Sequence, residues 1–355
     1  MTEGVGMDVL LHGDGAGIYP QGGPMSLVLP VEDATRVGEA RRAAVALADR
    51  VRLGEDAGGR LALVVTELAT NLARHARDGM LLLRATESRD AVEVLSLDRG
   101  PGIADLGSAL SDGYSTGGTR GAGLGAVRRV AQEFDVQTGA GVGSAIVVRV
   151  GASARQPQAS TLGVVCVPYP GESHCGDAWL VRDEGQQCTV ALIDGLGHGA
   201  SAAVAAHAAR EEVIRILAVT PRTSAATLLE AMHGALRSTR GAAASVAAID
   251  RAAGTIEFAG IGNVAGAIVA AADQRALVSH NGILGHQVRK VQAFTSPWPA
   301  GATLVMHSDG LSMRWRADQY PGLVTRDPAL LAGVLYRDHA RGRDDATVIA
   351  IRPIP

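Results

Sequence analysis

The alternation of apolar and polar positions divides the chain into two stretches that mix helices and strands. In the first stretch, apolar residues recur three or four apart over 34–52 and over 59–76, which predicts two amphipathic helices. A further helix is expected over 123–133, with two strands after it. Short apolar runs bounded by polar turns predict the other strands, at 27–31, 80–86 and 91–98. This order predicts a mixed α/β layer domain.

The second stretch places apolar strands between glycine-marked turns. Two helices are expected, over 201–219 and 223–239. The strands predicted here cover 161–169, 242–250, 255–263 and 265–271. We therefore expect two antiparallel sheets flanked by helices, and an α+β chain of two domains.

A small, polar segment separates the two stretches. Residues 151–160, GASARQPQAS, show no hydrophobic periodicity and are typical of a linker. The first 26 residues are rich in glycine and are expected to be loosely ordered. The predicted domains therefore cover 27–150 and 161–355.

Composition narrows the class of protein. The net charge of −3 and the absence of like-charged blocks give no support for a nucleic-acid or membrane partner. The most apolar stretch, 264–272, is far shorter than the roughly 20 residues that span a bilayer. An odd number of cysteines with no CxxC pair is typical of a reducing compartment. We expect a cytoplasmic protein.

Polar chemistry in the first domain begins on its second helix. Glu67 and Asn71 stand four residues apart and share one helix face. A carboxylate and a carboxamide placed in this way can hold Mg²⁺ and orient a hydroxyl or a water. An ordinary solvated helix face would explain the pair equally well.

Two glycine-rich motifs follow in the same domain. The segment DRGPGI at 98–103 comes directly after a strand, and its glycines permit a tight turn. The segment GGTRGAGLGAVRRV at 117–130 leads into a helix whose amino end favours phosphate. It lacks the GK[ST] of a P-loop and follows a loop rather than the first strand, which argues against a dinucleotide fingerprint.

In this order, the three motifs resemble the GHKL ATPase family, whose domain is a Bergerat-type α/β sandwich. The segment DGYSTGGTRGAGLGAVRRVAQEFD most resembles the switch serine kinases of bacterial stressosomes. The resemblance implies that Asn71 holds Mg²⁺ with ATP, Glu67 is the general base and Asp98 contacts adenine. It also implies a nucleotide pocket shaped by Gly100, Gly102, Gly121, Gly123, Leu124 and Gly125.

The family also contains ATP binders without catalysis, so an active kinase and a silent binder both stay open. A sensor histidine kinase has the same ATPase fold but needs a phospho-accepting histidine on an upstream helical hairpin. Only His12 precedes this domain, in a glycine-rich segment unsuited to a helix. That alternative is rejected.

Aspartates in the second domain recur in turns next to strands. The segments are CGDAWLV with Asp177, VALIDGLGHG with Asp194, LVMHSDG with Asp309, and RGRDDATVIAI with Asp344 and Asp345. Converging carboxylates repel one another unless a cation lies between them. Hard oxygen ligands favour Mg²⁺ or Mn²⁺, and two such ions activate water and clamp a phosphate.

Simpler explanations compete with this one. Any single Asp-Gly segment is an ordinary turn, but four in this order, each with its strand, make that explanation a poor one. A serine nucleophile lacks its GxSxG elbow. For a cysteine phosphatase loop, Arg182 lies one place too far from Cys175.

The order GD…DGxGHG…SDG…DDAT resembles the metal-dependent protein phosphatases, an α-β-β-α sandwich, and most of all the stage-II sporulation and stressosome feedback serine phosphatases. The resemblance implies that Asp194 bridges two Mn²⁺ or Mg²⁺ ions and that Gly195 offers its carbonyl. Asp309 and Asp344 would complete one metal site and Asp177 would lie beside the other. Asp345 would support these ligands without binding a metal, and His198 would either do the same or donate a proton to the leaving group.

A kinase-like ATPase and a phosphatase in one chain suggest opposing reactions on one phosphoprotein. By the resemblance, that partner would be a phosphorylated STAS-domain anti-sigma antagonist or a stressosome scaffold protein. Two alternatives stay open for the first domain. It would either sense ATP and gate the phosphatase, or only bind a partner.

Overall fold

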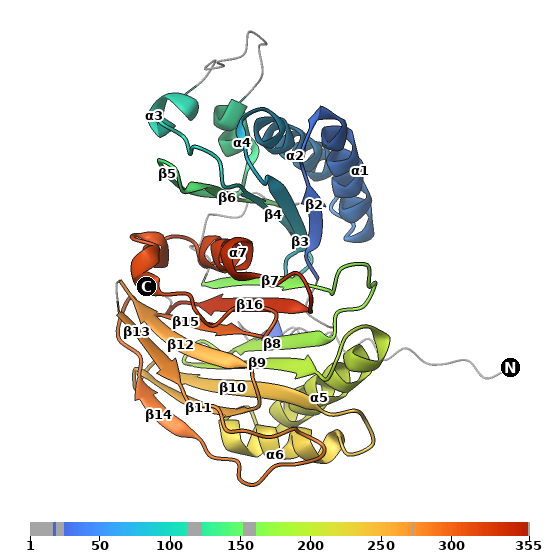
Figure 1. Cartoon of the computed structure of the whole chain (residues 1–355), viewed down its shortest axis with the longest axis vertical. Helices are drawn as coiled ribbons and strands as arrows, with labels where there is room; N and C mark the ends of the chain where they lie inside the picture. The colour runs from blue at the N-terminus through green and yellow to red at the C-terminus, as the bar shows by residue number, and fades with distance from the viewer. Residues whose placement is uncertain (1–16, 19–24, 112–122, 152–160, 272, 354–355) are drawn as a thin grey trace, which may run out of the picture.

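The computed structural model describes residues 17–18, 25–111, 123–151, 161–271 and 273–353. These residues form stacked layers of helix and sheet (Figure 1). The expected linker lies outside them except for Gly151, which ends a strand. Of the N-terminal segment expected to be loose, only 17–18 and 25–26 are described. None of the helices within the described ranges has both the length and the apolar character that crossing a bilayer requires.

The N-terminal half is a sheet with helices on one face. Its described strands lie in the order β2-β3-β4-β6-β5, all antiparallel. The strands are β2 (Leu27–Pro30), β3 (Met80–Ala85), β4 (Ala91–Leu97), β5 (Glu133–Gly139) and β6 (Gly143–Gly151). The helices are α1 (Ala34–Arg50), α2 (Glu55–His75), α3 (Leu106–Ala109) and α4 (Gly123–Val130).

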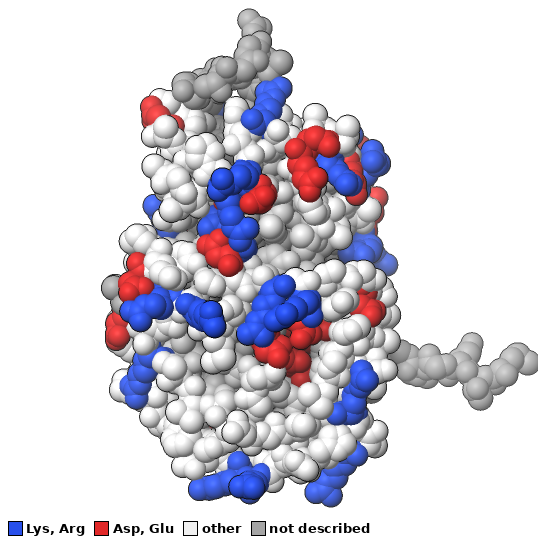
Figure 2. Space-filling view, viewed as in Figure 1, with Lys and Arg blue, Asp and Glu red and all other residues white. Residues whose placement is uncertain are grey.

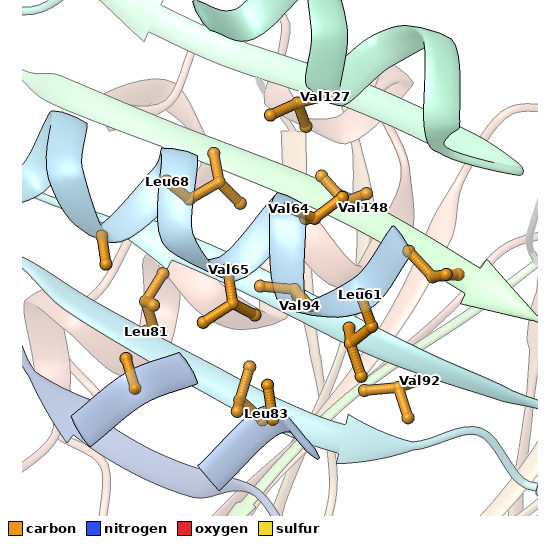
Figure 3. Packing of buried hydrophobic residues seen from close by; sticks show 14 of the residues in the cluster. Leu61, Val64, Val65, Leu68, Leu81, Leu83, Val92, Val94, Val127 and Val148 are labelled. Atoms are coloured by element: carbon orange, nitrogen blue, oxygen red, sulfur yellow. The ribbon is translucent and has the colours of Figure 1, made fainter. Parts of the chain in front are cut away.

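The apolar stripe of α2 forms the centre of this half. Leu61, Val65 and Leu68 are fully buried and lie against Leu81 and Val94 of the sheet (Figure 3). The four-residue spacing that predicted an amphipathic helix is therefore the spacing of the core.

Helix boundaries differ from the expected ones for local reasons. Helix α2 begins at Glu55, one turn before the expected start, with Glu55 and Asp56 in its first turn. Carboxylates there interact favourably with the free N–H groups of a helix, which offsets the cost of Gly58 and Gly59. Helix α4 ends at Val130, so the expected helix over 123–133 is too long at its C-terminal end.

The C-terminal half consists of two antiparallel sheets packed face to face. Among the described strands, one sheet has the order β1-β8-β9-β10-β11-β14 and the other β13-β12-β15-β16-β7. The first sheet contains β1 (Gly17–Ile18), β8 (Asp177–Asp183), β9 (Gln187–Gly195), β10 (Ala242–Asp250), β11 (Thr255–Ile261) and β14 (Phe294–Pro297). The second contains β7 (Leu162–Val167), β12 (Ala265–Ala270), β13 (Asp273–Leu277), β15 (Thr303–His307) and β16 (Ala346–Ile351).

Helices cover the outer faces of both sheets, so this half has the expected α-β-β-α architecture. Helices α5 (Ala200–Val219) and α6 (Ala225–Ala235) pack on the first sheet. Helix α7 (Pro328–His339) packs on β7 and β16 of the second. Short 3-10 turns, η1 (Ala317–Gln319) and η2 (Leu323–Thr325), precede α7.

Helix α7 also covers the second face of the N-terminal sheet (Figure 1). One apolar cluster includes Leu95, Leu97 and Val147 of that sheet together with Leu330 and Val334 of α7. Residues 328–335 are all buried. A helix enclosed on both sides has no polar stripe, and the sequence analysis accordingly predicted no helix here.

Ionic contacts accompany this apolar interface. Both terminal nitrogens of Arg149 reach Asp327, Nη1 to Oδ2 at 2.6 Å and Nη2 to Oδ1 at 3.0 Å. Asp327 also accepts a hydrogen bond from Ala329 N and so caps α7. Arg149 further contacts buried Glu93 at 2.6 Å. Burial alone would raise the pKa of Glu93, but Arg84 and Arg149 outweigh burial and hold that pKa below its usual value.

Two further contacts join the two halves. Ser26 N donates to Cys166 O at 2.7 Å, and the Arg84 guanidinium lies 6.0 Å from the ring centroid of Trp179. Basic and acidic side chains border one another over the face shown in Figure 2.

We expect Arg149→Met to lower the free energy of unfolding by about 3–5 kcal/mol, because it removes the bidentate partner of Asp327 and leaves buried Glu93 with Arg84 as its one remaining countercharge. The measurement is urea unfolding followed by circular dichroism. The matched control is Arg326→Met, whose exposed pair with Asp135 should contribute less than about 1 kcal/mol. Equal effects of the two substitutions would contradict this assignment.

Candidate functional site

The aspartates singled out in the C-terminal half lie where strands of the two sheets begin or end. Asp177 opens β8 and Asp194 lies near the end of β9, and the two are directly paired across these antiparallel strands. Asp309 follows β15 and Asp344 precedes β16, which is the neighbouring strand of the other sheet. The fold therefore brings together residues separated by more than a hundred positions.

Hydrogen bonds hold two of these carboxylates in place. Ser308 Oγ donates to Asp177 Oδ2 at 2.7 Å and accepts from Thr347 N at 2.9 Å. Asn263 Nδ2 donates to Asp309 Oδ2 at 2.5 Å. The sequence analysis did not single out Ser308, Thr347 or Asn263. The glycine-asparagine turn after β11 was visible, but only the folded sheets show that it faces Asp309.

Burial and mutual repulsion oppose ionisation of this cluster. Burial, together with Asp345 and Asp309, raises the pKa of Asp177 to about 7 even though Ser308 donates a hydrogen bond to it. Burial and then the charge of Asp177 raise the pKa of Asp194 well above its usual range. The pKa of Asp309 is raised by burial and by Asp344. Carboxylates in this state are stabilised by a cation.

The donor set fits hard divalent cations. Asp177 Oδ1 and Asp345 Oδ2 are buried and have no hydrogen-bond partner among the described residues. Orphaned buried oxygens of this kind are costly unless an ion or water satisfies them. Among the described residues, no group of three or more His, Cys, Asp or Glu side chains lies close enough together to hold a metal ion as the chain stands.

Glycines let the strands approach each other around the cluster. A Cβ atom on Gly310 would lie 1.9 Å from Asp345 O, and one on Gly176 would lie 2.5 Å from Asp345 Oδ2. Gly195 N donates to Gly176 O at 3.1 Å, next to Asp177. The glycines of the GD and SDG motifs therefore serve close packing rather than a special backbone angle.

His198 and Asp345 occupy well-defined surroundings near the cluster. His198 Nδ1 lies 3.1 Å from Glu172 Oε1, and its ring stacks on Tyr169 with centroids 4.1 Å apart. Asp345 Oδ1 accepts from Tyr169 N at 2.9 Å. These contacts orient both side chains through the loop that precedes β8.

The polar residues singled out in the N-terminal half lie at one end of its sheet. Glu67 Oε2 accepts from Gly123 N, the first residue of α4, at 3.2 Å. Asn71 follows one turn later on α2, and both side chains are half-buried. Asp98 Oδ1 accepts from Gly100 N at 2.7 Å. Burial raises the pKa of Asp98, although Gly100 and Ser144 donate to it.

Most of the residues singled out in the two glycine-rich motifs at this end of the sheet are described by the structure. Gly102 has a φ of +81°, and a Cβ atom there would lie 2.3 Å from Gly139 O, so the position requires glycine. Leu124 and Gly125 are buried in the first turn of α4. Gly121 lies outside the described residues.

Helix α7 connects the two groups of polar residues. Arg337 Nη1 donates to Asp98 O at 2.7 Å, and Arg99 Nη2 donates to Arg337 O. At the end of α7, Ser312 N donates to His339 O at 2.9 Å and Arg341 N donates to Gly310 O at 2.8 Å. One helix therefore contacts the Asp98 turn at one side and the Asp309 turn at the other.

Comparisons with known proteins match each half separately. A family model described as histidine kinase-like ATPase domain matches residues 30–150. A model of the stage II sporulation protein E family matches residues 184–353, a range that begins after Asp177.

Individual relatives divide in the same way. The chain is 35% identical over 89 residues to serine/threonine-protein kinase RsbT of Bacillus subtilis (strain 168), covering 24% of this chain and 67% of that protein. It is 26% identical over 144 residues to phosphoserine phosphatase RsbX of the same organism, covering 40% and 70%. The crystal structure of RsbX in complex with magnesium matches with 21% identity and a TM-score of 0.46, covering 53% and 92%.

The raised pKa of Asp177 predicts how stability without metal depends on pH. A carboxyl group with a folded pKa of about 7 stabilises the fold while protonated, and this stabilisation is lost as pH rises through 7. With EDTA present at pH 8, we expect Asp177→Asn to raise the free energy of unfolding by on the order of 2 kcal/mol. At pH 5 the gain should be clearly smaller but not zero, because the folded wild-type group is then protonated whereas the same group in the unfolded chain, with its ordinary pKa of 3.8, is still ionised.

Urea unfolding at the two pH values measures this difference. Asp318→Asn, which changes an exposed aspartate, is the control and should give no pH-dependent gain. A gain for Asp177→Asn of the same size at both pH values would contradict the raised pKa.

Proposed function

We propose that the two domains of this chain act in opposite directions on one phosphoprotein. The N-terminal domain belongs to the histidine kinase-like ATPase family. The C-terminal domain belongs to the stage II sporulation protein E family of serine/threonine phosphatases. The relatives RsbT and RsbX are named as a kinase and a phosphatase, respectively. Their likenesses occur here in a single chain. Tethering would keep both activities at high local concentration near a shared partner.

Aspartates from both sheets lie near one another, and two of their buried oxygens have no hydrogen-bond partner among the described residues. This observation supports assigning the phosphatase function to particular residues. We assign Asp194, Gly195, Asp309 and Asp344 as metal ligands, with Asp177 beside the second metal. Phosphatases of this family are metal-dependent, and two Mn²⁺ or Mg²⁺ ions would supply an activated water and a clamp for the phosphate. Ser308 and Asn263 hold Asp177 and Asp309 in the orientation that binding requires.

Three further observations support this assignment. The ionised forms of Asp177 and Asp194 are disfavoured without a cation, so metal binding relieves repulsion already present in the fold. Asp345 is held by Tyr169 N and supports the cluster from the side. His198, bonded to Glu172, is placed to exchange a proton near the site.

For the N-terminal domain we assign Asn71 to Mg²⁺ with ATP, Asp98 to the adenine and Glu67 to the general base. Asp98 lies at the end of a buried strand and Gly102 forms the tight turn after it. The Glu67 side chain extends from α2 to the amino end of α4, where free N–H groups favour phosphate. By the resemblance of the sequence motifs to stressosome kinases and phosphatases, the phosphoprotein would be a STAS-domain anti-sigma antagonist or a stressosome scaffold.

The α7 contacts favour a second role for the N-terminal domain, as an ATP sensor that gates the phosphatase. A nucleotide bound at Asp98 would act on the turn in which the Asp98 carbonyl accepts a hydrogen bond from Arg337. The end of the same helix is bonded to the turn that bears Asp309. Gating and kinase activity are compatible, because a nucleotide site can serve both.

We expect Asp194→Ala and Asp309→Ala each to lower Mn²⁺-dependent hydrolysis of p-nitrophenyl phosphate by more than about 100-fold, since each removes a proposed metal ligand. Asp318→Ala, which changes an exposed aspartate, should retain full activity. Hydrolysis that survives both phosphatase substitutions would refute the assignment.

Incubation with labelled ATP and a purified STAS-domain protein tests the other domain. Transfer of label that is lost in Glu67→Ala supports the kinase, whereas ATP binding without transfer leaves only the sensor.

Gating predicts that a non-hydrolysable ATP analogue, at constant free Mn²⁺, changes kcat for p-nitrophenyl phosphate about fivefold or more in the wild type. In Arg337→Ala the analogue should bind but change kcat less than twofold, because the contact with Asp98 O is gone. Arg316→Ala, with an exposed ion pair, should behave as wild type. An analogue effect that persists in Arg337→Ala would show that α7 is not the connection.

A further inference from the structure

A cavity of about 450 Å³ lies between the two domains and reaches the phosphatase site. Asp177, assigned above beside a metal, lines it together with His174 and His207 of the phosphatase domain. The ATPase domain contributes Arg50, from the last turn of α1, and Arg89, from the turn between β3 and β4. The walls of this cavity therefore come from both domains.

Arg50 and Arg89 of the ATPase domain therefore line a cavity whose other wall belongs to the phosphatase domain. Both residues are exposed, and among the described residues neither guanidinium has a carboxylate partner. This sets them apart from Arg84 and Arg149, which are buried in ion pairs with Glu93. A guanidinium without a partner beside a cavity is available for an anionic ligand, and its planar fork suits carboxylate and phosphate groups.

The occupant can be named by its chemistry. The volume is that of a pocket for a small ligand or a few residues of peptide. Asp177 belongs to the aspartate cluster and also lines the cavity, so a peptide whose phosphate lies at the cluster can extend into the cavity. Acidic side chains in that continuation would complement Arg50 and Arg89.

We propose that this interdomain cavity receives the phosphorylated segment of the protein substrate, and that Arg50 and Arg89 bind its acidic flanking residues. The ATPase domain then determines the specificity of the phosphatase directly, apart from any use of ATP. The proposal rests on the phosphatase function assigned above. Arg50 and Arg89 are specificity residues and not catalytic ones, because the reacting phosphate lies at the aspartate cluster.

The test uses the full chain with Mn²⁺ and three substrates. These are a synthetic phosphoserine peptide flanked by glutamates, the same peptide with glutamines, and p-nitrophenyl phosphate. We expect the wild type to show a lower KM for the glutamate peptide than for the glutamine peptide. In the double variant Arg50→Ala, Arg89→Ala, the KM for the glutamate peptide should rise about tenfold with kcat within twofold, and the preference should vanish. Hydrolysis of p-nitrophenyl phosphate should not change.

Arg42→Ala is the matched control, because Arg42 is an exposed arginine of the same helix that does not line the cavity. It should leave all three substrates unaffected. Binding of the fluorescein-labelled glutamate peptide in EDTA, followed by anisotropy, gives a readout without turnover. The wild type should bind more tightly than the double variant, and high salt should remove the difference.

Several outcomes would overturn the proposal. One is a wild type without preference between the peptides, and another is a double variant that keeps the preference. An equal loss for p-nitrophenyl phosphate would place the arginines at the metal centre instead. Failure of the phosphatase function itself looks different, because no substrate is then hydrolysed by the wild type while anisotropy still reports whether the arginines bind the peptide.

Discussion

The burial of α7 between two sheets is the constraint on which the rest of this structure depends. The N-terminal sheet has one face covered by its own helices, and the C-terminal sheet of β7 and β16 has one face packed on the other C-terminal sheet, so each needs a partner for its remaining face. One apolar helix meets both needs, and Gly333 at its centre lies close to Leu95 and Leu97 of the N-terminal sheet. The bidentate contact of Arg149 with Asp327 fixes the start of the helix by joining its cap to the ATPase domain.

This arrangement has a consequence for function. In an interface made only of surface residues, the two domains could move separately. Here a helix of the phosphatase fold is part of the hydrophobic core beneath the ATPase sheet, so a shift of one domain is opposed by the packing of the other. The same helix contacts the Asp98 turn and is bonded to the Asp309 turn. The two assigned sites therefore share a structural element, and the cavity beside Asp177 has walls from both domains.

The aspartate cluster shows how stability is given up for chemistry. Asp177 and Asp194 are buried next to other carboxylates, and without a cation their ionised forms oppose folding. The hydrogen bond from Ser308 to Asp177 compensates only part of that cost. Elsewhere in the chain, buried charges such as Glu93 have partners of opposite sign. The difference separates a site built to bind cations from an interface built to hold two domains together.

Local pattern by itself determined the two-layer and four-layer architectures, most helices and strands, and the polar residues at strand ends. Glu67, Asp98, Asp194 and Asp309 were singled out because each lies in a short motif next to a clear apolar run. Helix α7 was missed because a helix buried all round shows no amphipathic stripe, and β13 was missed because its five residues are mostly polar. Only the tertiary structure decided that Asn263 faces Asp309, that Arg337 reaches Asp98, and that Arg50 and Asp177 line one cavity. Such contacts join residues far apart in the chain, and their formation depends on how whole sheets and helices pack.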